Sequence, residues 1–263
     1  MSDFKGIKGV FFDLYGTLLI YGDMEAAWDE WLGEFYRQMK TAGLDLSIDE
    51  FSQRCDGFFS GRDPAPSGGL TPFEVRIKDF AEGAGVFPDA RKLKDIADRT
   101  VSVWQQYVSV DPEAAEVLRT IKQTKKTAMI SNFDHPPHVY DLLSDFGLID
   151  LLDVIVVSGE TGYKKPDPEI FDLALNRTGL SAEEVIFVGD AEVDVEGSKN
   201  AGMIPVLLQR PGHAGEDESA RDYRSGVDDK EWTVSKKMEG TRTIESLSEI
   251  LDLQVVRERF IID

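Results

Sequence analysis

Acidic side chains follow two short apolar runs of this chain, at points where strands of a sheet would end. Val10–Phe12 is followed at once by Asp13, and Val185–Val188 leads to Asp190, with Asp194 four residues further on. An ionised carboxylate is costly to leave unpaired at the end of an apolar strand, so each of these acids needs a partner or a chemical role. Ligands of open α/β sheets bind just beyond the carboxyl ends of the strands. The spacing therefore predicts carboxylates gathered at one edge of a sheet.

Hydroxyl, amide and amine groups lie near the same predicted edge. Thr17 follows Asp13 across a glycine that permits a tight turn, Ser131 and Asn132 follow the apolar stretch 127–130, and Lys165 precedes a proline. Carboxylates bind hard cations such as Mg²⁺, whereas hydroxyl, amide and ammonium donors bind phosphoryl oxygens. The set therefore indicates a site that binds a cation and a phosphoryl group together.

These four segments, in this order, resemble the motifs of the haloacid dehalogenase (HAD) superfamily, and they extend from residue 10 to residue 202. The resemblance implies that Asp13 is the nucleophile, which attacks phosphorus and forms a covalent intermediate that water later cleaves. It also implies that Lys165 neutralises the nucleophile and the transferring group. The implied phosphate ligands are Thr17, Ser131 and Asn132.

The resemblance further implies Mg²⁺, held by Asp13, the backbone carbonyl of Tyr15, Asp190 and Asp194. Asp194 has two other possible roles, because it can pair with Lys165 or cap the helix that follows. The implied activity is Mg²⁺-dependent hydrolysis of a small phosphorylated metabolite through an aspartyl-phosphate intermediate.

Tyr15 is the departure from the phosphatase pattern, which has a second aspartate at this place as general acid and base. Phenol, with a pKa near 10, is a poor base at neutral pH. Tyrosine here resembles instead the metal-independent 2-haloacid dehalogenases, whereas Asp190 in its Gly-Asp-Ala context is of the metal type. Two alternatives therefore stay open: a dehalogenase, and a weakly active or non-catalytic binding or regulatory protein on the same scaffold. His135 and His138 can replace the missing acid or be exposed loop residues, and we expect the latter.

Composition limits the partners and the compartment. A formal net charge of −20 argues against binding to nucleic acid or to an anionic membrane. The single cysteine, Cys55, excludes an internal disulfide, so we expect a small core residue and a cytoplasmic protein. We find no secretory signal and no apolar run of about twenty residues. The oligomeric state has no signature in the sequence.

The hydrophobic periodicity predicts an α/β fold. Strands and helices alternate after residue 111, which is typical of βαβ units in a parallel sheet. Helical spacing dominates earlier, with predicted helices at 24–39, from 47, at 71–82 and at 89–108. Together with the resemblance, this implies a Rossmann-like parallel sheet core formed by 1–19 and 109–263, with an inserted α-helical cap at 20–108.

The C-terminal part carries three further predictions. Residues 211–240 are polar and weakly patterned, and we interpret them as a surface loop rather than an active-site flap. Residues 243–253 have apolar positions at helical spacing, which predicts a final helix. Residues 255–263 are apolar enough that we expect them to pack on the domain or on a partner.

Overall fold

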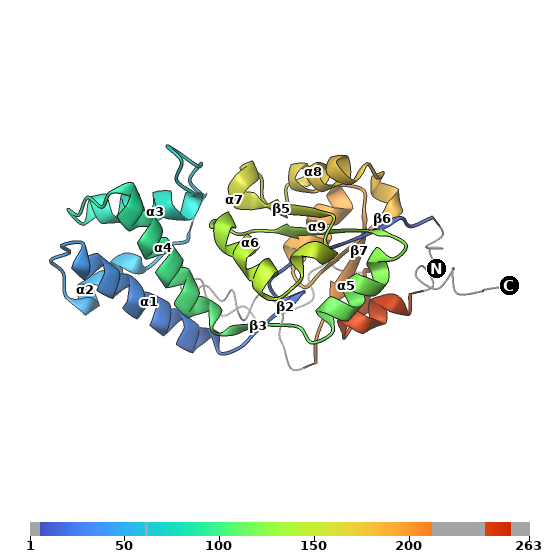
Figure 1. Cartoon of the computed structure of the whole chain (residues 1–263), viewed down its shortest axis with the longest axis horizontal. Coiled ribbons are helices and arrows are strands. Elements are labelled where there is room, and N and C mark those ends of the chain that lie inside the picture. The colour runs from blue at the N-terminus through green and yellow to red at the C-terminus, as the bar shows by residue number, and fades with distance from the viewer. Residues whose placement is uncertain (1–5, 61–62, 212–239, 254–263) are drawn as a thin grey trace.

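A six-stranded parallel sheet forms the centre of the computed structural model, which describes residues 6–60, 63–211 and 240–253 (Figure 1). The strand order is β5-β4-β1-β6-β7-β8, and every neighbouring pair is parallel. The strands are β1 (Gly9–Phe12), β4 (Lys126–Ser131), β5 (Val154–Val157), β6 (Val185–Gly189), β7 (Ile204–Leu208) and β8 (Arg242–Ile244). The predicted Rossmann-like α/β class is confirmed, and β1, which leads to Asp13, lies in the interior of the sheet between β4 and β6.

Helices cover both faces of this sheet, as its continuous apolar strands require. Val10 and Phe12 of β1 point to one face and pack in a cluster that includes α5 (Ala114–Lys122) and α6 (Pro136–Asp145). Phe11 points to the other face, where α8 (Pro168–Thr178) packs. The helix α9 (Glu192–Asn200) follows β6 and contacts both β6 and β7. The shorter helical segments are α7 (Ser158–Thr161), η1 (Ile149–Leu151) and η2 (Ala182–Glu184).

In the described part of the chain, four helices are inserted between two short strands, β2 (Leu19–Tyr21) and β3 (Val108–Val110), which pair antiparallel. They are α1 (Met24–Thr41), α2 (Ile48–Cys55), α3 (Pro72–Gly83) and α4 (Ala90–Gln105). Figure 1 shows them as a lobe beside the sheet. They share a hydrophobic cluster of their own, in which Cys55 is buried, as expected. The boundaries assigned to core and cap stay a prediction, and the sequence analysis did not identify β2 and β3.

Local signals fix the helices of this lobe. Ser47 and Thr71 each form a capping box with the glutamate three residues on, which satisfies N–H groups at the starts of α2 and α3.

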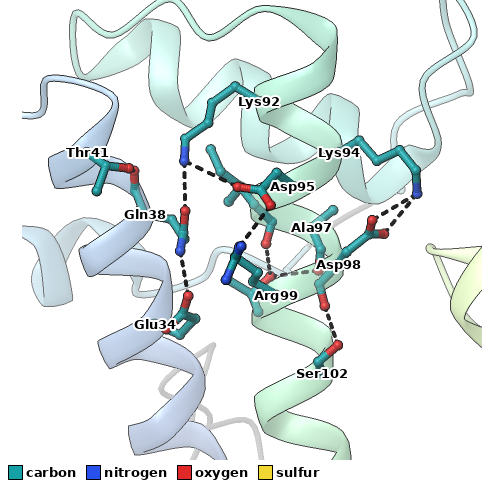
Figure 2. Close-up of polar contacts among 12 residues, drawn as sticks. Glu34, Gln38, Thr41, Lys92, Lys94, Asp95, Ala97, Asp98, Arg99 and Ser102 are labelled. Atoms are coloured by element: carbon teal, nitrogen blue, oxygen red, sulfur yellow. Dashed lines mark hydrogen bonds and ion pairs between the residues drawn. The ribbon is translucent and has the colours of Figure 1, made fainter.

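Polar side chains join α1 to the start of α4, as Figure 2 shows. Lys92 Nζ donates to Gln38 Oε1 at 2.7 Å, and Gln38 Nε2 donates to Glu34 Oε1 at 2.6 Å. The lobe thus has polar as well as apolar contacts between its helices.

The predicted final helix at 243–253 is wrong. Residues 242–244 form β8, whose Ile244 lies opposite Leu208 of β7, and residues 247–251 form the 3-10 helix η3. The β-branched residues Thr243 and Ile244 favour a strand, and pairing with the sheet edge satisfies their backbone groups. Ile244, Leu247 and Ile250 are still buried. The apolar positions of this segment therefore face the core, although the segment is not the predicted helix.

The remaining C-terminal predictions cannot be compared with the structure. Most of the predicted loop 211–240, and all of 255–263, lie outside the described residues. Among the described residues, no helix is both long and apolar enough to cross a membrane.

Candidate active site

Asp13 stands at the carboxyl end of β1, where the neighbouring strands deliver the other predicted site residues. Its backbone N–H donates to Val188 O at 2.9 Å, which extends the β1–β6 pairing to the acid itself. The side chain is only 3% exposed. Ser131, at the end of β4 on the other side of β1, is also buried. The parallel register therefore fixes Asp13 between these two strand ends.

The turn after Asp13 approaches Asp190 closely. Gly16 has φ 89°, and a Cβ built on it would lie 2.1 Å from Asp190 Oδ2, so only glycine fits this position. Thr17 Oγ1 donates to Asp190 Oδ1 at 3.1 Å. The turn thus places the predicted phosphate ligand Thr17 directly against a predicted metal ligand.

Three buried carboxylates meet at this end of the sheet. Asp13, Asp190 and Asp194 each offer an oxygen atom, and these atoms all lie within 4.8 Å of one another. Asp194 lies in the first turn of α9, and its Oδ2 accepts from Ala191 N at 3.1 Å. Asp194 was expected to cap a helix that follows it, but α9 starts two residues earlier, at Glu192, so Asp194 caps the helix from within its first turn. Asp13, Asp190 and Asp194 therefore converge in the structure, as the sequence predicted.

Lys165 provides the positive charge within this cluster. Its ammonium donates to Asp13 Oδ1 and, at 2.6 Å, to Asp194 Oδ1. The residue is 4% exposed, so both ion pairs are buried. Of the roles considered for Asp194, the structure contains two: it pairs with Lys165, and it caps α9.

Asn132 fixes the backbone of Lys165. Lys165 N donates to Asn132 Oδ1 at 2.8 Å, and Asn132 Nδ2 donates to Lys165 O at 3.0 Å. Both polar groups of the amide are therefore engaged by one residue, which joins the end of β4 to the loop before α8. The phosphate-binding role predicted for Asn132 stays a prediction; its observed contacts position Lys165.

Burial and the negative charge of neighbouring carboxylates make Asp13 and Asp190 harder to ionise than free carboxyl groups. Burial raises the pKa of Asp13 to about 6, although the Lys165 ammonium acts in the opposite direction. Burial, followed by the charges of Asp13 and Asp194, raises the pKa of Asp190 well above its ordinary value. The one positive charge of Lys165 is thus insufficient to balance the negative charges of the carboxylates at this site.

A divalent cation fits this donor set. Asp13 Oδ2 is buried and has no hydrogen-bond partner within the described parts of the chain. An unpaired carboxylate oxygen is costly inside a protein, and Mg²⁺ prefers oxygen ligands of this kind. The carboxylates of Asp13 and Asp190 are therefore suited to hold one ion, as the sequence predicted.

The side chain of Tyr15 points toward α4. Its hydroxyl donates to Gln105 Oε1 at 3.2 Å. Its ring lies 5.0 Å from the ring of Phe133 and 5.4 Å from that of Trp104. Burial, assisted by the negative charge of Asp13, raises the pKa of the phenol further above its ordinary value. The structure thus gives Tyr15 a packing role and no ionised form at neutral pH.

Gln105 is a residue that the sequence analysis missed. Its Nε2 donates to Val108 O at 3.1 Å, which orients the amide and leaves Oε1 as the acceptor for Tyr15 and for His138 Nε2 at 3.0 Å. Burial, followed by the nearby His135, lowers the pKa of His138 to about 4, so this imidazole is neutral. Gln105 is the last residue of the amphipathic helix α4, and nothing in that position predicted that it would bind Tyr15 and His138.

His135 is completely buried and His138 lies partly buried in α6, so the expectation that both are exposed loop residues is wrong. Its Nε2 lies 3.0 Å from Asp98 Oδ1 of α4, and its Nδ1 lies 3.1 Å from Thr71 Oγ1 at the start of α3. The inserted helices pack over this segment and exclude it from solvent. His135 therefore joins the loop after β4 to the helical lobe.

Comparisons with known proteins agree with this geometry. Residues 7–202 match a family model described as haloacid dehalogenase-like hydrolase. A phosphoglycolate phosphatase of Pectobacterium atrosepticum is 25% identical over 206 residues, which cover 77% of this chain and 80% of that protein. A ribulose-1,5-bisphosphate 5-phosphatase of Halopiger xanaduensis is 28% identical over 250 residues, or 93% of this chain and 98% of that protein.

A solved structure described as a HAD phosphatase from Thermococcus onnurineus has the same fold. It superposes with a TM-score of 0.62 and 21% identity, covering 94% of this chain and 97% of that one.

Proposed function

The chain belongs to the haloacid dehalogenase-like hydrolases, and we propose that it hydrolyses a small phosphorylated metabolite through an aspartyl-phosphate on Asp13. The observation that carries this proposal is the buried cluster in which Lys165 pairs with one oxygen of Asp13 while the other oxygen has no partner among the described residues. That arrangement supports a nucleophile held in place by a lysine and completed by a cation.

Asp13 and Asp190 would hold Mg²⁺ through their carboxylates and Tyr15 through its backbone carbonyl. Asp194 would act mainly through Lys165, because both its oxygens already accept hydrogen bonds. Bound Mg²⁺ would offset the charge repulsion between the nucleophile and the phosphate dianion.

In the first step, an oxygen of Asp13 attacks phosphorus. A bond forms between that oxygen and phosphorus, the bond from phosphorus to the ester oxygen breaks, and the leaving oxygen takes its electron pair. The Lys165 ammonium favours the ionised form of Asp13, against the effect of burial, and places positive charge beside the transferring group. Thr17 and Ser131 would donate to the phosphoryl oxygens from the ends of neighbouring segments.

In the second step, water attacks phosphorus of the aspartyl-phosphate. The bond from phosphorus to the Asp13 oxygen breaks, which restores the carboxylate and releases inorganic phosphate. The water proton and the leaving oxygen need a proton acceptor and a donor, respectively. Tyr15 does not provide either, because its hydroxyl is engaged by Gln105 and its pKa is raised. Substrates with acidic leaving groups should therefore react best.

The direct test is release of inorganic phosphate from phosphorylated metabolites and from p-nitrophenyl phosphate, with Mg²⁺ and with EDTA. We expect turnover with Mg²⁺ and its loss in EDTA. Release of halide from 2-chloropropionate without added metal would instead support the dehalogenase alternative. If neither substrate class is turned over, a binding or regulatory role on this scaffold is favoured.

A further inference from the structure

Arg210 lies just after β7 and reaches back to the turn that carries the nucleophile. Its Nη1 donates to Gly16 O, and its Nη2 donates to Thr17 O at 2.6 Å. Its side chain is only 12% exposed. One guanidinium thus binds two consecutive carbonyl groups within four residues of Asp13.

Asp111 completes this arrangement from the end of β3. Its Oδ2 accepts from Arg210 Nη2 at 2.6 Å and from Arg210 Nε at 3.2 Å. Its backbone N–H donates to Leu18 O at 3.0 Å, and its Oδ1 accepts from Glu113 N at 2.8 Å. Asp111 therefore orients the guanidinium and is itself tied to the same turn.

The contacts of Arg210 set the orientation of two peptide groups. The peptide between Gly16 and Thr17 points its carbonyl to Arg210 and its N–H to Leu14 O at 3.3 Å. The turn is closed further by Leu19 N, which donates to Leu14 O at 2.8 Å. Rotation of the Gly16–Thr17 peptide would displace Thr17, whose hydroxyl bonds Asp190.

We propose that Arg210 and Asp111 are positioning residues for the reaction: they fix the turn 14–19, so that Asp13, Thr17 and the carbonyl of Tyr15 meet Asp190 in the productive arrangement. This inference rests on the proposed function. A displacement of about 1 Å in a catalytic arrangement can cost about 10²-fold in rate, so a clamp on two carbonyls of the nucleophile turn has catalytic consequences.

An arginine suits this position and a lysine does not. The planar guanidinium presents donors in a rigid fork, which here reaches two carbonyls and a carboxylate at once. An ammonium group is a point charge and cannot maintain all these directions. Substitution of Arg210 by Lys should therefore preserve the ion pair with Asp111 but loosen the turn.

The experiment compares Arg210→Met and Arg210→Lys with the wild type in the full-length protein. Hydrogen–deuterium exchange of the peptide that contains residues 14–19 measures the turn directly. Phosphatase kcat and KM, and Mg²⁺ affinity by calorimetry without substrate, measure the consequences. Arg177→Ala is the matched control, because Arg177 Nη1 also donates to a backbone carbonyl, Ile155 O at 2.9 Å, but away from this turn.

We expect exchange in 14–19 to accelerate at least about tenfold in Arg210→Met, with a smaller effect in Arg210→Lys and none in the control. The kcat should fall about 10- to 100-fold while KM changes less than threefold, and Mg²⁺ affinity should fall. The double variant Arg210→Met/Asp111→Leu should recover thermal stability, because it removes both buried charges, but not kcat.

Unchanged exchange in 14–19 would overturn the proposal. A normal kcat in Arg210→Met would also overturn it, as would recovery of both kcat and stability in the double variant. Either result would show that the ion pair between Arg210 and Asp111 has only a structural role. If the wild type hydrolyses no phosphate ester, the proposed function fails and the catalytic part of this inference fails with it. The exchange result still decides whether the clamp orders the turn.

Discussion

Replacement of Tyr15 tests the claim that the enzyme lacks a general acid at the leaving group. The structure separates two properties of this side chain: its packing against Phe133 and Trp104, and its hydroxyl, which donates to Gln105. Tyr15→Phe removes only the hydroxyl. Because that hydroxyl donates its hydrogen bond to Gln105 Oε1 and not to the reacting groups, we expect kcat within about threefold of the wild type.

Tyr15→Asp introduces the missing carboxyl group. A positioned general acid or base contributes about 10² to 10⁴ in rate, so hydrolysis of an alkyl phosphate should accelerate within that range if the new group reaches the leaving oxygen. The kcat/KM for p-nitrophenyl phosphate reports the first step and should rise little, because p-nitrophenolate leaves without a proton. The same substitution removes a buried aromatic ring, which typically costs about 3–5 kcal/mol of stability.

Tyr15→Asn is the matched control, since it has the size of Asp and the same loss of aromatic packing but no acid. The measured quantity is the ratio of kcat/KM for p-nitrophenyl phosphate to that for a simple alkyl phosphate. We expect a large ratio in the wild type and in Tyr15→Asn and a much smaller one in Tyr15→Asp. Equal rates on both substrates in the wild type, or a loss of about 10² in Tyr15→Phe, would refute the reasoning.

Three other predictions follow from the same site. Asp13→Asn should reduce turnover by several orders of magnitude without loss of the fold, and near-normal rates would exclude Asp13 as nucleophile. Asp190→Asn should weaken Mg²⁺ binding, measured by calorimetry. Loss of an outer-shell partner costs roughly 10- to 100-fold in metal affinity, and loss of this carboxylate ligand should cost at least as much. An unchanged affinity would place the ion elsewhere. The pKa of His138 is lowered to about 4 in the folded protein, so the unfolded chain takes up the proton first as pH falls from about 6.5 to about 4. This contribution to stability is full above pH 6.5 and lost through that window, by up to about 3 kcal/mol. Denaturant unfolding of His138→Gln should therefore show a smaller loss between pH 7 and pH 4.5 than the wild type, and an equal loss would contradict the assignment.

The carboxylate cluster was predictable because sequence order and sheet topology act together. Asp13 and Asp190 each follow an apolar run, and parallel strands bring their carboxyl ends to one edge. Lys165 was identified by its position before a proline and by the family resemblance. The sequence therefore indicated which residues meet at the site.

The partners that orient those residues were not predictable. Gln105 and Arg210 contact the nucleophile turn from positions about 90 and 194 residues away, and no local pattern indicates such contacts. His135 precedes two prolines and was expected to lie in an exposed loop, but the inserted helices bury it. These contacts depend on how the lobe and the sheet pack, which a single sequence does not specify.

Identification of the covalent intermediate tests the central claim most directly. The enzyme would be mixed with p-nitrophenyl phosphate and Mg²⁺, quenched during turnover and reduced with borohydride, which converts an aspartyl-phosphate to homoserine. Tandem mass spectrometry then locates the change. We expect homoserine at position 13, dependent on both substrate and Mg²⁺. Phosphate release during turnover with Asp13 unmodified, or with the label on another residue, would contradict it.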